Sequence, residues 1–536
     1  MSSGHTAQYI ALTLAIAGLQ FAWSLETGFG SPYLLSLGLK KSLVSLVWLA
    51  GPLSGLVTQP LVGILSDKST SRFGRRRPYI VGSTICSVFC LVVIGWTREI
   101  AGGHQTLTIW LAVAAFYLLD FAINCLQACL RALIVDVLPA ARQDAGTAWA
   151  SRMIGIGNVV GYLMGFLDLV HLLPFLGSTH MQILTTIAST GLGSTVAVTC
   201  YFTPETPISR PPSQPGDSLK ALTTLFTSLR SLPVVIKRIF RIQLFAWIGW
   251  FPFLFYSTTY VADLYVAAHG SSDDDAEAME RGTRAGSLAM FAHAVVTLCS
   301  SLILPLFTYS TAAPSMPPPP PPASHSATAL EKLWAGAGRA RAKLSVSLPT
   351  MWAISLGVFS LAMLSTLVTS TVAVASALLA ICGMSWAVAM WIPFSMIGEA
   401  IRSTSAVSGQ QRPGEMHSVP GPGDYMQLAT GDIPMEPMAN HGADDLEIDS
   451  PAAIEPDSSS AEMSAGTILG VHNVFIVIPQ FITAFASSLI FAVFEHMQET
   501  EPGQAGGHHA RQIALVMSLG GLSAAAAVYM AWKLGH

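Results

Sequence analysis

Four polar side chains recur at regular intervals along an otherwise apolar stretch that begins near residue 107. They are Asp120, Asn124, Gln127 and Arg131, at relative positions i, i+4, i+7 and i+11. Because an α-helix turns by about 100° per residue, eleven residues bring the direction back to within about 20° of its start. The spacing therefore predicts one helix with a polar stripe along a single face.

The two charged members of this stripe, Asp120 and Arg131, are candidates for acid–base chemistry. At 1.5 Å per residue they are separated by about 16 Å along the helix axis, too far for a direct salt bridge. A carboxyl group held away from water can capture and release a proton near neutral pH. We expect Asp120 to carry a proton and Arg131 to steer its release or close a gate. The alternative is a structural ion pair with a basic residue on another helix.

A second acid, Glu26, lies within the first apolar stretch of the chain. Gln20, Trp23 and Thr27 share one helix face there, and Glu26 follows one turn after Trp23. An aromatic surface beside amides and carboxylates is the mixture that a sugar-binding site requires. We predict that Glu26 contacts a sugar or exchanges a proton, and a hydrogen bond between helices is the alternative.

The composition around these residues is far more apolar than that of a soluble protein. Of 536 residues, 51% are hydrophobic and 11% are charged, and the mean hydropathy is +0.53, whereas soluble domains carry roughly 25% charged residues. The lipid bilayer is therefore the expected solvent. The formal net charge is −4 and the basic residues are scattered over short loops, which argues against nucleic-acid binding. No pattern typical of an enzyme active site, a metal site or a bound cofactor is found.

Twelve stretches are long and apolar enough to cross a bilayer, which takes about 20 residues per helix. We divide the chain into an N-terminal six-helix bundle at 1–203, a linker at 204–240 and a C-terminal six-helix bundle at 241–536. The predicted spans lie near 9–29, 44–65, 79–97, 107–130, 148–169, 182–202, 241–262, 286–308, 350–370, 375–396, 466–491 and 511–531.

Lys and Arg collect in the breaks after the second and the sixth span, which predicts that these breaks face the cytosol. An even number of spans then places both termini in the cytosol. Lys40 and Lys41, in a break predicted to face outward, run against this rule.

Two cytosolic segments, 309–349 and 402–463, are predicted to be disordered. The first contains the run Pro317 to Pro322, and the second is rich in Ser, Pro, Gly and acids. We interpret both as solvated tethers. The alternative is a regulatory segment that is phosphorylated at residues such as Ser450 or Ser458.

Two neighbouring segments resemble a known family. They are G-L-Q-F-A-W-S-L-E-T-G-F-G-S-P-Y-L-L-S-L-G-L (18–39) and W-L-A-G-P-L-S-G-L-V-T-Q-P-L-V-G-I-L-S-D-K-S-T-S-R-F-G-R-R-R-P-Y-I (48–80). They resemble the sucrose/proton symporters, which belong to the glycoside-pentoside-hexuronide cation symporters of the major facilitator superfamily. The similarity continues at 120–133, 157–162, 247–253, 391–394 and 469–480. It therefore touches both halves of the chain.

This resemblance implies an all-α membrane protein with the major facilitator fold: twelve transmembrane helices in two six-helix bundles with inverted repeats, which close alternately around a central site. Asp120 matches the proton-binding aspartate of the family and Arg131 its essential arginine. The signature of the superfamily between spans two and three is matched by Gly63, Asp67, Arg72, Gly74, Arg75, Arg76 and Arg77, and we expect this loop to close the cytosolic side. The candidate sugar contacts are Trp23, Glu26, Gln127, Asn158 and Asn473.

Two departures separate the chain from the plant members of this family. Plant members carry a histidine in the outer loop after the first span, where this chain reads L-G-L-K-K-S (37–42). They also carry D-T-D-W-M-G-R-E after W-F-P-F, where this chain reads S-T-T-Y-V-A-D-L (257–264). Glu26, the S-T-T-Y segment and the long loop before the eleventh span resemble the fungal sucrose and α-glucoside carriers and the animal melanosome-type relatives more closely.

We expect a proton-coupled importer of sucrose or a related α-glucoside such as maltose. It would act as a monomer in the plasma membrane, or in the vacuolar membrane, with the proton as its coupling ion and no other cofactor. A proton-coupled carrier of another small solute and a non-transporting sugar sensor are the alternatives.

Overall fold

The computed structural model describes residues 3–67, 69–205, 232–269, 275–309, 345–409, 465–500 and 508–535. Most of the predicted linker at 204–240 and of the predicted disordered segments at 309–349 and 402–463 lies outside these ranges, as do Ser450 and Ser458. The predicted boundary at 241 falls inside a helix that begins at Val234.

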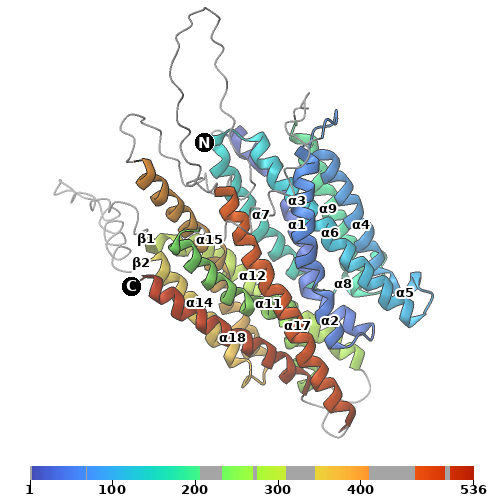
Figure 1. Cartoon of the computed structure of the whole chain (residues 1–536). Coiled ribbons are helices and arrows are strands. Elements are labelled where there is room, and N and C mark those ends of the chain that lie inside the picture. The colour runs from blue at the N-terminus through green and yellow to red at the C-terminus, as the bar shows by residue number, and fades with distance from the viewer. Residues whose placement is uncertain are drawn as a thin grey trace, which may run out of the picture.

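Twelve long helices, each of 18 residues or more, make up nearly all of the described chain (Figure 1), as the spans predict. They are α1 (Ser3–Ser36), α3 (Ala50–Asp67), α4 (Arg77–Gly95), α6 (Gln105–Val137), α7 (Ala140–Phe166), α9 (His180–Phe202), α11 (Val234–His269), α12 (Asp275–Ile303), α14 (Leu348–Ser365), α15 (Val372–Gly409), α17 (Ala465–Thr500) and α18 (His508–Gly535). The short elements are α2 (Lys41–Val47), α5 (Thr97–Ile100), α8 (Leu169–Leu172), η1 (Pro174–Leu176), η2 (Leu304–Phe307) and the paired strands β1 (Thr308–Tyr309) and β2 (Val346–Ser347).

Eleven helical segments of the described chain are long and apolar enough to cross a membrane. The long helix that does not qualify is α7, because Arg142, Asp144 and Arg152 lower the hydropathy of its first half. The prediction of an all-α membrane protein is confirmed: there are twelve long helices, as many as the predicted spans, and eleven spans meet the criterion of length and apolarity.

The helices form two bundles, seen side by side in Figure 1, with α1 to α9 in one and α11 to α18 in the other. Close packing inside a bundle depends on small residues. A Cβ added to Gly249 of α11 would lie 2.7 Å from the carbonyl oxygen of Gly520 on α18. These two helices therefore approach each other at a point where only glycine fits.

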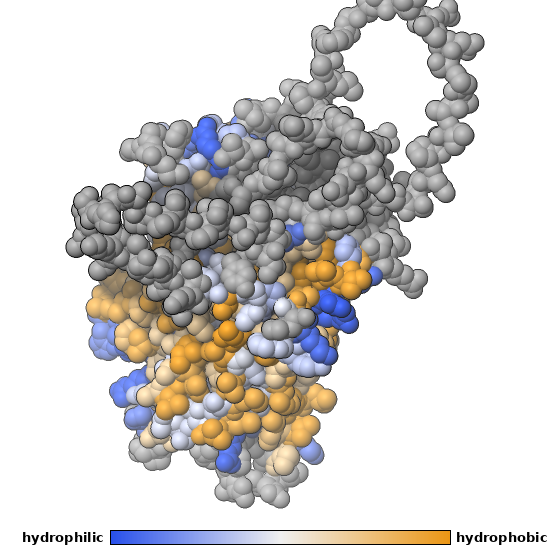
Figure 2. All heavy atoms as spheres, turned by 90° about the vertical axis from the view of Figure 1, so that its left-hand side faces the viewer, coloured by the Kyte–Doolittle hydropathy of each residue, from blue (hydrophilic) through white to orange (hydrophobic). Residues whose placement is uncertain are grey.

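The outside of the bundles is apolar. Figure 2 shows the side on which α14, α15 and α18 lie, with hydrophobic residues over much of the described surface. On these helices, large apolar side chains such as Leu361 of α14 and Leu522 of α18 are 67% and 56% exposed. A surface of this kind fits the hydrocarbon of a bilayer, and the chain is an integral membrane protein that crosses the bilayer several times.

Two ends of the molecule are distinguished below. The basic end is where α1 begins and where α3 is joined to α4 through Arg75, Arg76 and Arg77. The α2 end is the opposite one, where α1 leads into α2.

Candidate functional site

The two buried acids predicted from the sequence lie together. Glu26 of α1 and Asp120 of α6 line one narrow pocket, and their side chains are close enough for their charges to interact. Glu26 is 1% exposed and Asp120 is 5% exposed. The remaining lining residues are Gly30, Leu34, Val47, Trp48 and Phe116, so the lining contains two acids and no basic side chain.

Burying both carboxyl groups in ionised form in such a pocket is costly, because neither has a cation in the lining to neutralise it. The Oε2 atom of Glu26 is buried and has no hydrogen-bond partner among the described residues. A proton held by one of the two acids removes a charge and supplies a donor for a carboxyl oxygen. The pocket is therefore suited to binding a proton.

The polar stripe lies on one continuous helix, α6, as its spacing predicts. Next to Asp120, the side chain of Asn124 is also buried, and it donates to Ser54 Oγ at 2.9 Å and accepts from Gln59 Nε2 at 3.1 Å. Further along, Gln127 is half-buried and Arg131 is exposed. The exposure of the stripe's side chains therefore increases from Asp120 toward the basic end.

Two of the predicted sugar contacts lie where α1 meets α7. Gln20 donates to Asn158 Oδ1 at 2.9 Å, and the hydroxyl groups of Thr27 and Tyr162 are 3.3 Å apart. Trp23 lies on α1 between these two contacts and is half-buried. Asn158 thus forms the kind of hydrogen bond between helices that was the alternative for Glu26, and sugar contact by Asn158 and Trp23 stays a prediction.

The C-terminal bundle contributes an amide that the sequence prediction did not select. Gln480 of α17 approaches Gly51 of α3 so closely that a Cβ on Gly51 would lie 2.7 Å from Gln480 Nε2 and 3.9 Å from Asp120 Oδ1. Gln480 therefore reaches the neighbourhood of the pocket from the opposite bundle. Its spacing of seven residues from Asn473 is a signal that points to the same helix face. The side chain of Asn473 itself is not among those described.

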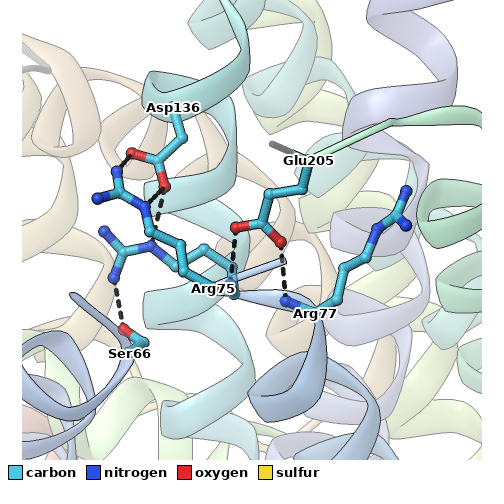
Figure 3. Close-up of polar contacts among 6 residues, drawn as sticks. Ser66, Arg75, Arg77, Asp136 and Glu205 are labelled. Atoms are coloured by element: carbon cyan, nitrogen blue, oxygen red, sulfur yellow. Dashed lines mark hydrogen bonds and ion pairs between the residues drawn. The ribbon is translucent and has the colours of Figure 1, made fainter. Parts of the chain in front are cut away.

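A network of charged groups holds the loop between α3 and α4 at the basic end (Figure 3). Arg75 and Arg76 both donate from Nε to Asp136 Oδ2 at 2.9 Å, and Arg76 also donates to Ser66. Glu205, just after α9, accepts the backbone N–H groups of Arg76 at 2.7 Å and of Arg77 at 3.1 Å. Asp136 and Glu205 were not selected from the sequence.

The other residues of the predicted gating loop have different environments. Arg72 is exposed, and its guanidinium group lies 4.9 Å from the centre of the Phe73 ring. Gly74 has a φ of +106°, a conformation that favours glycine, and a Cβ there would collide with Glu205. Gly63 and Asp67 lie on α3, and the side chain of Asp67 is not among those described, so its predicted role is untested.

Comparison with known proteins points to one family. A family model described as "MFS/sugar transport protein" matches residues 9–268. The general alpha-glucoside permease of Schizosaccharomyces pombe is 33% identical over 576 residues, which cover 97% of this chain and 92% of that protein. Sucrose transport protein SUT3 of Oryza sativa subsp. japonica is 30% identical over 316 residues, which cover 54% of this chain and 62% of that protein.

Solved structures agree on the fold. A bacterial homologue of the lysosomal transporter spinster has a TM-score of 0.56 at 12% identity and covers 100% of this chain and 97% of its own. A structure described under substrate recognition in proton-dependent oligopeptide transporters has a TM-score of 0.58 at 10% identity, covering 99% of this chain and 98% of its own. At these identities the likeness concerns the fold alone.

Proposed function

This chain belongs to the sugar-transport family of the major facilitator superfamily, and we propose that it is a proton-coupled symporter that imports an α-glucoside such as maltose, or sucrose, by alternating access. Family membership makes it a transporter and not an enzyme. The observation that carries the proton coupling is the pocket in which Glu26 and Asp120 lie together without a basic residue in its lining.

The proton carrier in this proposal is Asp120. With a proton bound, the pocket contains one negative charge fewer, so the bundles can close over it at a lower cost in desolvation. Loss of the proton toward the basic end restores the charge and favours the state in which water reaches the acid. Arg131 lies eleven residues further toward that end and is exposed, so of its two predicted roles we propose the closing of a gate on this side.

The sugar is expected to bind beside this pocket, between the two bundles. Trp23 offers an aromatic surface, and Gln127 and Asn158 offer amide groups from the N-terminal bundle. Glu26 and Asn473 complete the predicted set. The support for this assignment is chemical, because hydroxyl groups need such donors and acceptors and the ring face of a sugar needs an aromatic partner.

The basic end faces the cytosol in this proposal, because the arginines that surround Asp136 and Glu205 gather there. Both termini are then cytosolic. Lys41 ran against the rule that basic loop residues face the cytosol. It does not argue against this orientation, because its side chain forms an ion pair with Asp263. One chain contains both bundles and the pocket, so we propose that the monomer is the functional unit, in the plasma membrane or else in the vacuolar membrane.

Uptake of labelled maltose and sucrose in cells that lack their own carriers tests the function. We expect uptake against a concentration gradient that increases when the outside is acidified and collapses when a protonophore is added. The control is the same cells with an empty vector. If the protein is present at the surface and neither sugar enters, the carrier of another solute and the sugar sensor become the better explanations.

The variant Glu26→Gln tests whether the two acids act as a pair. Removing one carboxyl group leaves a single acid to hold the proton that the pair otherwise shares, so this proton is lost more readily and the pH profile of uptake shifts to lower pH, by about one pH unit or more. Initial rates of sugar uptake measured from pH 4 to pH 8 provide the profile. The matched control is Glu277→Gln, which changes an exposed acid on α12 and should leave the profile unchanged. An unshifted profile for Glu26→Gln contradicts the pairing.

A further inference from the structure

The two bundles are tied together at the α2 end by contacts that start from the first residues of α2. Lys41 Nζ lies 2.7 Å from Asp263 Oδ2 on α11, and the two side chains are 13% and 5% exposed. The next residue, Ser42, donates its backbone N–H at 3.1 Å and its hydroxyl at 2.6 Å to the carboxylate of Glu495 on α17. One turn of α2 is therefore attached to two helices of the opposite bundle.

A second tie joins the bundles where α7 meets α12. Arg284 of α12 pairs with Asp168, just after α7, at 3.0 Å and also donates to the carbonyl oxygen of Phe166 at 3.2 Å. Hydrogen bonds from the side chain and backbone of His171, together with the charge of Arg284, lower the pKa of Asp168 to about 2. This carboxyl group therefore keeps its charge unless the pH falls toward that value.

The helix that carries the first tie, α2, ends at the pocket that contains Glu26 and Asp120, because Val47 and Trp48 line this pocket. Trp48, which lines that pocket, stacks on Phe255 of the opposite bundle with ring centres 4.6 Å apart. Ser31 accepts from Trp48 Nε1 at 2.9 Å and donates to the carbonyl oxygen of Phe255 at 2.9 Å. Parting of the bundles at the α2 end therefore separates Trp48 from Phe255 beside the pocket.

The partners in these ties gain water when the bundles part. Lys41, Asp263 and Glu495 are polar groups near the end of the helices, so each is rehydrated once its partner moves away. The ties are thus suited to break and form again within a transport cycle, unlike contacts in the apolar core of one bundle.

We propose that Lys41, Asp263, Ser42 and Glu495 form a latch, called here the α2 latch, that holds the α2 end closed and sets how often it opens. Arg284 and Asp168 act as its second point of attachment. This inference rests on the proposed alternating access. The members of the latch are positioning residues: they act on the sugar and on the proton only by controlling access to the pocket.

The rate at which a buried cysteine reacts tests the α2 latch. Ser45 of α2 is fully buried and accepts a hydrogen bond from Tyr256 of the opposite bundle at 2.9 Å, so Ser45→Cys reports on opening at this end. The purified protein is treated with a hydrophilic maleimide, and the peptide that contains residue 45 is quantified by mass spectrometry. Reading that peptide alone excludes signal from native thiols such as Cys299, which is exposed.

In the Ser45→Cys background, we expect Asp263→Asn and Lys41→Met each to raise the labelling rate at least threefold. The exchanged pair Lys41→Asp with Asp263→Lys should bring the rate back toward that of the parent, because it restores the attraction with the charges reversed. The matched control is Glu277→Gln, which removes an exposed ion pair with Arg281 inside α12 and should leave the rate unchanged.

Equal labelling rates in the parent, Asp263→Asn and Lys41→Met would overturn the α2 latch. So would a charge exchange that labels as fast as the single variants while keeping the thermal midpoint of the parent. Because the measurement uses neither sugar nor a proton gradient, it can succeed when the proposed substrate is wrong. It can equally fail when uptake of maltose or sucrose is confirmed.

Discussion

Replacing Asp120 by Asn should abolish uphill accumulation of sugar, so that the ratio of inside to outside concentration falls to about one. Asn has the shape of a protonated Asp but binds no proton, so the pocket stays permanently in its neutral form. The bundles of such a variant can still move around a bound sugar, and exchange of labelled for unlabelled sugar is expected to continue. Accumulation and exchange are measured in the same membrane vesicles, with and without an imposed pH gradient.

The control for this variant is Asp168→Asn, which neutralises an acid at the α2 end that lies outside the pocket. Its accumulation should still follow the pH gradient, although its rate changes if the second tie is weakened. Uphill uptake by Asp120→Asn at the level of the parent would refute the assignment of the proton to this residue. Loss of both accumulation and exchange would instead indicate that Asp120 is needed for the sugar or for the fold.

The polar stripe on α6 was predictable because its geometry belongs to a single helix. The period of the α-helix alone places Asp120, Asn124 and Arg131 on one face, and a continuous helix over Gln105–Val137 is sufficient to make it so. The pocket was harder to predict from the period of one helix. Its second acid lies on α1, and the closure of its wall depends on Trp48, which follows the short helix α2.

The sequence did not predict which charged residues pair with each other when they are distant in the chain. Lys41 contradicts the charge rule for membrane loops when it is counted as a loop residue, yet it pairs with Asp263, 222 residues later. The arginine run at 75–77 was predicted to close the cytosolic side, but periodicity carries no information about its carboxylate partners on α6 and after α9. Pairing of this kind is decided by how the helices pack and not by spacing along one of them.

Replacing Asp136 by Ala should be among the most destabilising changes in the protein, costing about 3–5 kcal/mol of folding free energy. Asp136 accepts hydrogen bonds from Arg75 and Arg76, and the side chain of Arg76 is 3% exposed. Removing the carboxylate leaves the guanidinium group of Arg76 in a site with little water to solvate it. The thermal midpoint of the purified protein in detergent and the yield of folded protein from membranes are the measurements.

Two further variants separate the effect of the Asp136 charge from the effect of any change in this loop. Arg72→Ala removes an exposed arginine of the same loop, whose side chain lies over Phe73, and should change stability by no more than about 0.5 kcal/mol. Asp136→Asn keeps an acceptor oxygen but loses the charge. Its stability should lie between that of Asp136→Ala and that of Arg72→Ala. If the thermal midpoint of Asp136→Ala equals that of Arg72→Ala, the carboxylate of Asp136 does not hold this loop in place. The backbone hydrogen bonds from Arg76 and Arg77 to Glu205 would then be the stabilising contact, because they anchor the start of α4 without Asp136.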